Sequence, residues 1–227
     1  MFDHKQKGKD NEDGDAFLVS SLQAKKSKYS FSQFLKRFSI VKEEMQIDLD
    51  EFDLSYYTYG MSIYKNMPLI EPLETKEVKK IYEFVIVLDT SYSIDENLAK
   101  RFISNTYSIL STSNMFYKSC KVHIIQCDDR IRKDDVISNQ NEMDQLLNSF
   151  TLVGKGNTDF RPVFSYVNDL INQKVFQNLC GLLYFTDGKG IYPKKSPAYK
   201  TAFIYLEDYD QSKVPSWAIQ YRLEEKL

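Results

Sequence analysis

Histidine, cysteine, proline and glycine are scarce in this chain, which contains 2, 3, 6 and 8 of them among 227 residues. So few glycines and prolines argue against a chain rich in linkers. The cysteines, Cys120, Cys127 and Cys180, are odd in number and lack the CxxC spacing, so we interpret them as reduced, mostly buried thiols. The histidines, His4 and His123, are too few to build a zinc site.

Long apolar runs and an excess of charge of one sign are also missing. No segment approaches the roughly 18 apolar residues that a membrane span needs. The opening residues MFDHKQKGKDNEDGD have no apolar core, so they are not a secretory signal. The 30 basic and 32 acidic residues give a net charge of -2, which provides no strong field for nucleic acid or anionic lipid. We therefore expect a cytoplasmic protein that binds neither nucleic acid nor a membrane.

The chain does contain enough apolar material for one large domain with a smaller appendage. Apolar residues make up 42% of it and aromatic residues 14%, and a domain of this size can bury roughly 70% of its unfolded surface. Residues 1–27 form a polar leader that we expect to be partly disordered. We expect residues 28–78 to form a short helix and an irregular β extension packed on the body, and residues 79–227 to form the main domain.

The main domain alternates predicted strands and helices. Residues 84–89, FVIVLD, read as a strand that is apolar on both faces, which is typical of a parallel sheet covered on both sides. Further strands are expected within residues 121–128, 130–138, 180–186, 201–207 and 217–223, and helices within residues 95–114, 141–150 and 162–173. This alternation predicts a doubly wound α/β fold, with a mostly parallel sheet and helices on both faces.

Three segments place oxygen-bearing side chains near the ends of these strands. They are residues 89–93 (DTSYS) after a buried strand, residues 156–159 (GNTD) before a helix, and residues 186–188 (TDG) after another buried strand. Ligands of open α/β sheets bind outside the carboxyl ends of the strands. Carboxylate and hydroxyl oxygens suit a hard cation such as Mg²⁺, whereas the lack of histidine and cysteine in these segments counts against zinc.

Each segment also has a purely structural interpretation. Residues 89–93 can be a strand-end turn in which a serine caps the next helix, and TDG is a common turn. Asp159 can cap the following helix or support a metal site from behind its ligands. Asp128 and Asp129 close the second strand; they can add to the acidic edge, but we favour a solvated turn. His123 is interpreted as a packed strand residue.

The order Asp-x-Ser-x-Ser, a distant Thr-Asp and a strand ending in Thr-Asp-Gly resembles the metal-ion-dependent adhesion site (MIDAS) of von Willebrand factor A (VWA) domains. From about residue 29 onwards, the segments FLKRF, YYTYG, NMPLIEPLE, GKGNTDFRPVF and LLYFTDGKGIYP resemble bacterial VWA-like proteins described as predicted metal-dependent peptidases. The resemblance implies a VWA fold and a bound Mg²⁺ or Mn²⁺ ion. The ligands that it implies are Asp89, Ser91, Ser93, Thr158 and Asp187, with the sixth position left for a carboxylate of a partner.

Two positions depart from the pattern of these families. Tyr92 and Asn157 stand where the families usually have glycine. Tyrosine occurs at the first position in integrin β subunits, and asparagine tolerates left-handed backbone conformations, so both loops can form. We group Tyr92, Asn157, Asp159 and Gly188 as residues that flank the site.

The sequence favours a non-catalytic protein-binding module whose metal ion captures an acidic residue of a protein partner. The resemblance implies a MoxR-type AAA+ ATPase or its client as that partner. The chain lacks an HExxH motif, so the peptidase description is not carried over. Two alternatives remain open. One is a metal-dependent or aspartic-type hydrolase built on Asp89, for which a second Asp-Thr-Gly is missing. The other is a structural domain with a degenerate site, which Tyr92 and Asn157 suggest.

Overall fold

The computed structural model describes residues 31–91, 94–112, 116–154, 156–206 and 209–223. Their contacts separate two compact units. The main unit consists of the described residues from 31 to 38 and from 81 to 223, and the arm consists of residues 39–80. The expected extension 28–78 is therefore divided, because its first helix packs with the main unit. The two units are described separately below.

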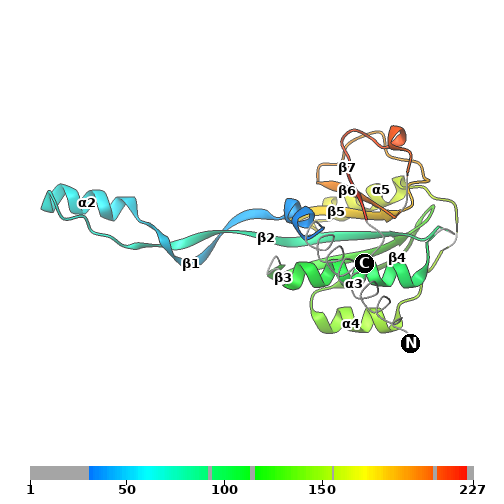
Figure 1. Ribbon diagram of the computed structural model, residues 1–227, viewed down its shortest axis with the longest axis horizontal. Helices are drawn as coiled ribbons and strands as arrows, with labels where there is room; N and C mark the ends of the chain where they lie inside the picture. The colour runs from blue at the N-terminus through cyan, green and yellow to red at the C-terminus, as the bar shows by residue number, and fades with distance from the viewer. Residues whose placement is uncertain (1–30, 92–93, 113–115, 155, 207–208, 224–227) are drawn as a thin grey trace, which may run out of the picture. The chain divides into compact units, whose positions relative to one another are not determined.

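The main unit is built on a mostly parallel sheet (Figure 1). Its strands lie in the order β4 (Ile131–Ile137), β3 (Phe116–Cys127), β2 (Pro72–Asp89), β5 (Leu179–Thr186), β6 (Thr201–Tyr205) and β7 (Ile219–Arg222). Only the edge pair β3–β4 is antiparallel, and the other pairs run parallel. This arrangement confirms the predicted α/β fold, including the edge strand expected within residues 130–138.

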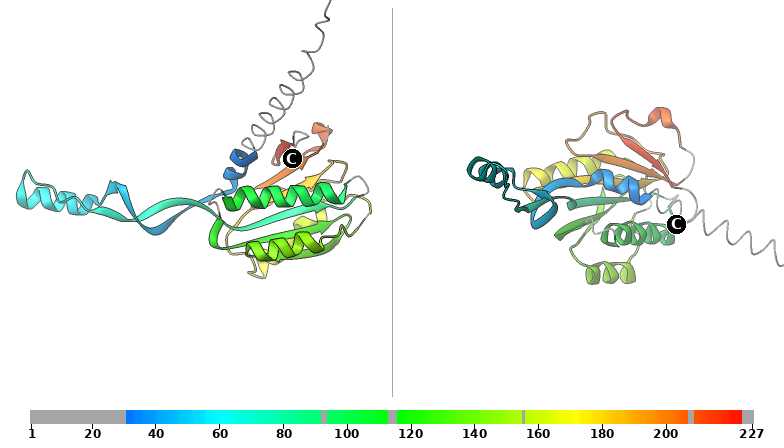
Figure 2. Two further views of the ribbon diagram at one scale, coloured as in Figure 1. Left: turned by 60° about the horizontal axis from the view of Figure 1, so that its bottom comes forward. Right: turned by 60° about the vertical axis from the view of Figure 1, so that its left-hand side comes forward.

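Helices cover both faces of the sheet, as the two-sided apolar strands predicted (Figures 1 and 2). The helices are α3 (Glu96–Thr112), α4 (Gln140–Ser149) and α5 (Arg161–Asn172). On one face, α5 packs its Val163 and Val167 into a buried cluster with Val85 of β2. On the other face, Phe102 of α3 stacks on Phe185 of β5 with ring centroids 4.1 Å apart. None of the described helices is long and apolar enough to cross a membrane.

The helix expected near residue 31 is present and belongs to this core. Residues 31–35 are helical and continue into a 3-10 turn, η1 (Lys36–Phe38). Phe38 is fully buried and meets the Phe84 ring edge-on at 5.5 Å. Gly181 of β5 lies so close beneath it that a Cβ atom there would overlap the Phe38 ring. The close approach explains why this fully buried strand contains a glycine.

The arm consists of two paired strands and a helix (Figure 2), and the strand pairing shifts register between Met45 and Asp48 and again between Asp48 and Phe52. Strand β1 (Ile40–Phe52) pairs antiparallel with the first half of β2, and α2 (Leu54–Tyr64) connects them. Asp53 caps α2, because its Oδ1 accepts hydrogen bonds from the backbone N–H groups of Ser55 and Tyr56 at 2.7 and 3.4 Å. Residues 75–83, TKEVKKIYE, are part of β2.

Candidate metal centre

The first loop of the candidate site begins where β2 ends, at Asp89. The apolar residues before it are fully buried, and so is Asp89 itself. Its Oδ1 accepts a hydrogen bond from Ser91 N at 2.9 Å, which turns the chain back over the strand end. Its Oδ2 accepts one from Thr186 Oγ1 at 2.6 Å, which ties β2 to β5. Ser93 and Tyr92 lie outside the described residues, so only part of this loop is seen.

Asp89 carries its carboxylate in an unfavourable environment. Burial raises the pKa of this carboxyl, the hydrogen bonds from Thr186 and Ser91 act in the opposite direction, and the nearby Asp187 carboxylate raises it again. None of the ion pairs in the described part of the chain includes Asp89. A buried carboxylate beside a second one, without a cationic side chain as partner, is an arrangement that a bound cation would stabilise.

The third loop reaches the same edge of the sheet. Strands β2 and β5 run in parallel with Leu88 beside Phe185, so the next residues, Asp89 and Thr186, end side by side. Asp187 follows and is only 6% exposed. Its Oδ1 accepts a hydrogen bond from Lys189 N at 3.0 Å, and its Oδ2 lies 3.5 Å from Lys189 Nζ. Gly188 has φ = +83°, a left-handed conformation that favours glycine at this turn.

The second loop is held to the edge by Asp128, which closes β3. Asp128 is fully buried, and its carboxylate accepts hydrogen bonds from Arg132 Nε at 2.8 Å, Arg132 Nη2 at 2.7 Å and Gly156 N at 3.1 Å. Its backbone oxygen also accepts one from Asp159 N at 3.0 Å. The interpretation of this residue as part of a solvated turn is therefore wrong. A carboxylate directly after a buried strand, with an arginine four positions later, was the available signal.

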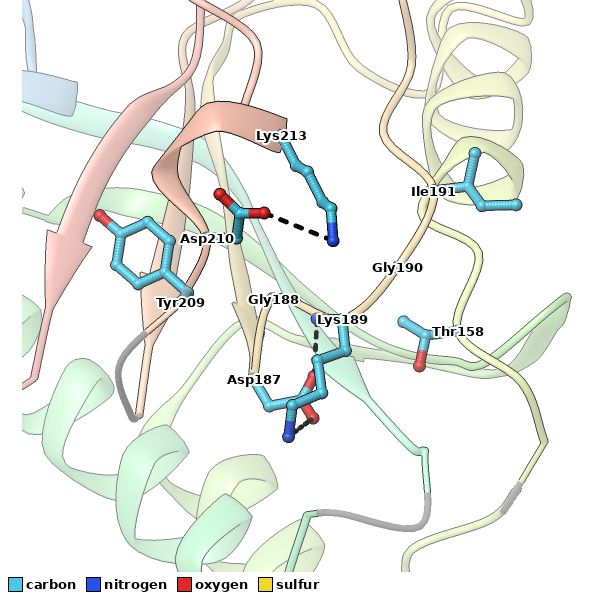
Figure 3. A pocket seen from close by; sticks show the side chains of 9 residues that line it. All are labelled: Thr158, Asp187, Gly188, Lys189, Gly190, Ile191, Tyr209, Asp210 and Lys213. Carbon is cyan, nitrogen blue, oxygen red and sulfur yellow. Dashed lines mark hydrogen bonds and ion pairs between the residues drawn. The ribbon is translucent and has the colours of Figure 1, made fainter.

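Thr158 of this loop faces the third loop across a pocket of about 590 Å³ (Figure 3). Asp187 lines the same pocket, together with Lys189, Tyr209 and Lys213. Gly190 allows the two loops to approach, because a Cβ atom there would lie 2.7 Å from Thr158 Cγ2 and 2.6 Å from the Phe160 ring. Two of the expected ligands, Thr158 and Asp187, thus line one pocket, whereas Asp89 and Ser91 lie at the end of the neighbouring strand β2 and are not among its lining residues.

The flanking residues have different surroundings. Asn157 is exposed. Asp159 lies at the start of α5, where its Oδ1 accepts from Arg161 N at 3.0 Å and its Oδ2 lies 2.6 Å from Arg161 Nη2. This hydrogen-bonded pairing with Arg161 holds the pKa of the Asp159 carboxyl below its ordinary value. The described contacts of the Asp159 carboxylate are thus with Arg161 at the start of α5, and none of them is with Thr158.

The residues of the edge fit a hard divalent cation. The hydroxyl of Thr90, between Asp89 and Ser91, is buried and has no hydrogen-bond partner among the described residues. Gly154, with φ = +148°, passes so close that a side chain there would overlap this hydroxyl. The described residues contain no group of three or more His, Cys, Asp or Glu that could hold a metal. The ligands expected from the sequence are two carboxylates and hydroxyls, and oxygen ligands of this kind suit Mg²⁺ or Mn²⁺ better than Zn²⁺.

The fold and the three loops define a VWA-like domain, and comparison with known families agrees. The model of the VWA-like domain family (DUF2201) matches residues 84–224, so the chain belongs to this family. None of the curated proteins matches the chain.

Solved structures of similar fold include several VWA domains. A von Willebrand factor type A protein from Catenulispora acidiphila is 9% identical, with a TM-score of 0.45 over 66% of this chain and 40% of that one. The ArnB paralog VWA2 from Sulfolobus acidocaldarius is 14% identical, with a TM-score of 0.45 over 83% of this chain and 52% of that one. Proximal thread matrix protein 1 from the mussel byssus, described with a zinc-occupied MIDAS motif, is 10% identical, with a TM-score of 0.44 over 63% of this chain and 44% of that one. The chain thus spans about half or less of these structures, and identities this low do not transfer function.

Proposed function

We propose that this chain is a non-catalytic protein-binding module in which a Mg²⁺ or Mn²⁺ ion captures a carboxylate of a partner protein. The observation that supports the proposal is the buried carboxylate of Asp89, which lacks a cationic partner among the described residues and lies near Asp187. Asp187 in turn lines a pocket with Thr158. The family resemblance adds Ser93 as a further ligand. It also suggests a MoxR-type AAA+ ATPase, or its client, as the partner.

The protein's own residues explain why the ion would remain receptive to an acid. Serine and threonine hydroxyls are neutral ligands, so Asp89 and Asp187 would be the only charged ligands of the expected set. Together they would balance, and not exceed, the charge of a divalent ion, which leaves its open position able to take a partner carboxylate. Asp89 and Ser91 are positioned by the β2 terminus, and Thr158 and Asp187 by the approach of the second and third loops at Gly190. Lys189 and Lys213 also line the pocket, where they pair with Asp187 at 3.5 Å and with Asp210 at 3.4 Å, so the charges of the lining balance before a cation binds.

Direct metal binding is the first part of the test. Mn²⁺ would be titrated into the wild-type protein, Asp89→Ala and the control Asp129→Ala, and free Mn²⁺ would be followed by electron paramagnetic resonance. Asp129 lies at the same sheet edge, but its side chain is 55% exposed and pairs with Arg132. We expect one Mn²⁺ site in the wild type and the control and none in Asp89→Ala. Equal binding by all three proteins would place the ion elsewhere, and no binding by any of them would favour a degenerate domain.

Carboxylate capture is the second part. A blocked tripeptide Gly-Asp-Gly and its Gly-Asn-Gly counterpart would be titrated in Mg²⁺ and in EDTA, with amide chemical shifts of Thr158 and Gly188 as the readout. We expect shifts only with the aspartate peptide and only in Mg²⁺. Shifts that persist in EDTA, or that the asparagine peptide also causes, would contradict metal-dependent recognition of a carboxylate.

A further inference from the structure

The arm buries almost nothing of its own. Among the residues of the arm whose burial is described, only Asp48 and Gly60 are buried, and every large apolar side chain described there is at least partly exposed. On β1, Met45, Ile47 and Leu49 are 92%, 64% and 83% exposed. Most of the exposed large apolar side chains among the described residues lie in the arm.

Helix α2 extends the exposed apolar surface. Its side chains Leu54, Tyr56, Tyr59, Ile63 and Tyr64 are between 49% and 66% exposed. Tyr56, Tyr59 and Ile63 are spaced by three and four residues and share one face of the helix, while Leu54 and Tyr64 lie on other sides of it. A helix that is apolar on all sides normally occurs inside a protein core or in contact with another surface. Its sequence is therefore suited to being covered.

The physics of small units gives the same conclusion. A two-stranded ribbon is marginally stable by itself in water, and an isolated helix shorter than about 12–15 residues is marginal too. The arm consists of one such ribbon and an 11-residue helix. A unit of this size usually needs a disulfide, a metal ion or association with another surface. The arm contains no cysteine, so association is the simplest source of stability.

Charge identifies the kind of surface that would cover the arm. The whole arm, residues 39–80, has nine acidic and five basic residues. Asp48 and Asp50 pair with Lys76 of the same arm at 3.1 and 3.5 Å. The acidic residues nearest α2 that no described ion pair includes are Glu51, Asp53, Glu71 and Glu74. They would repel an anionic lipid surface and the same segment of a second copy. A protein groove with an apolar floor and a rim of lysine and arginine would complement both the apolar side chains and the acidic ones.

We propose that the arm is a docking element whose apolar helix α2 lies in an apolar groove of a partner protein rimmed by basic residues. In this mode of recognition, side chains one turn apart enter the groove together. Tyr59 and Ile63 are four positions apart on α2, and they are 60% and 49% exposed. The flanking carboxylates would meet the basic rim. The inference does not depend on the candidate metal centre.

The test uses the full chain and two labelled helical probe peptides, one made of leucine and lysine and one of leucine and glutamate. Fluorescence anisotropy would measure their binding to the wild type and to three variants. The variants are Tyr59→Gln with Ile63→Gln, the charge reversal Glu51→Lys with Glu71→Lys, and the control Val136→Gln with Val153→Gln. The control residues are 47% and 42% exposed on the main unit. Glutamine keeps helix propensity close to that of good helix formers, so α2 is retained.

We expect the leucine–lysine peptide to bind the wild type and the control alike, and to lose at least about tenfold in affinity with the α2 variant. Charge reversal should lower the affinity for the leucine–lysine peptide more at low salt than at high salt. Weak or absent binding of the leucine–glutamate peptide is the matching expectation. Equal affinity of the leucine–lysine peptide for the α2 variant, or no binding to the wild type, would overturn the proposal.

Two further measurements separate the other occupants. Light scattering over a concentration series would detect self-association, and flotation with neutral and anionic vesicles would detect lipid binding. A dimer that the α2 variant abolishes would overturn the proposal in favour of a second copy. Flotation that the same variant abolishes would overturn it in favour of a lipid surface. A monomer that does not float would support it.

Discussion

Replacing Asp89 with asparagine should abolish the effect of a divalent cation on the stability of the protein. Asparagine has nearly the same shape, and its Oδ1 can still accept the hydrogen bond that Ser91 N donates to Asp89. The change removes the negative charge that a cation requires. It also removes a buried charge whose pKa is raised by burial, while it disturbs the hydrogen bond from Thr186. These two effects oppose each other in EDTA, so the informative quantity is the change on adding metal.

The magnitude of that change follows from binding linkage. A cation that binds only the folded protein, at a hundredfold excess over its dissociation constant, stabilises it by about 2.7 kcal/mol. For a domain of about 150–250 residues, 1 kcal/mol shifts the unfolding midpoint by roughly 2–4 °C. We therefore expect the wild type to gain about 5–11 °C on saturation with Mg²⁺ or Mn²⁺, and Asp89→Asn to gain none.

The assay is thermal unfolding followed by circular dichroism in EDTA, Mg²⁺ and Mn²⁺. Asp129→Asn is the matched control, because it removes a carboxylate from the same edge without touching Asp89. The control should gain as much as the wild type. A gain of the same size in Asp89→Asn would refute the assignment of Asp89 as a ligand. A gain in none of the three would refute metal binding by the folded domain.

The loops and the core lead to three further predictions. Gly154→Ala should destabilise the protein by about 1–3 kcal/mol in urea unfolding, because its φ of +148° suits glycine and the new Cβ atom would overlap the Thr90 hydroxyl. Asp128→Ala should cost at least about 1–3 kcal/mol, the cost of leaving the Gly156 N–H without its acceptor. It should also weaken Mn²⁺ binding, although Asp128 is not an expected ligand. Gly181→Ala should lower stability by about 1–3 kcal/mol through overpacking against Phe38, which thermal unfolding would measure, and an unchanged midpoint would contradict this packing.

The strands and their polar ends could be predicted because each strand carries its own signal. Residues such as Phe84 and Leu88 form an uninterrupted apolar run, which indicates burial on both faces without knowledge of any partner. The carboxyl ends of parallel strands then meet at one edge, so Asp89 and Asp187 could be expected to lie close together. The structure places both at that edge, with Thr186 bridging their strands.

Features that depend on residues far apart in the sequence were harder to predict. The role of Asp128 depends on Gly156, 28 residues later, and on the path of the second loop. The pairing of β1 with β2 was also hard to predict. Charged residues interrupt β1 and the first half of β2, so neither segment contains a continuous apolar run that would mark it as a strand, and the pairing partner has to come from elsewhere in the chain. Helix α2 had a local signal in the capping residue Asp53, but its mixture of tyrosine and glycine weakened the helical pattern.

The sheet edge and the arm make opposite demands on what they bind. The edge, if it holds a divalent cation, requires a carboxylate, whereas the acidic and apolar arm requires a basic rim around an apolar groove. One partner can satisfy both only by presenting acidic and basic surfaces at separate places, and otherwise two partners are involved. Chelation would remove the first contact and leave the second, while high salt would weaken the second more than the first, because charges at a solvent-exposed rim are screened. If one partner uses both contacts, each contact raises the effective concentration for the other. Loss of either contact would then lower the affinity of the partner by more than the affinity of that contact measured alone would suggest.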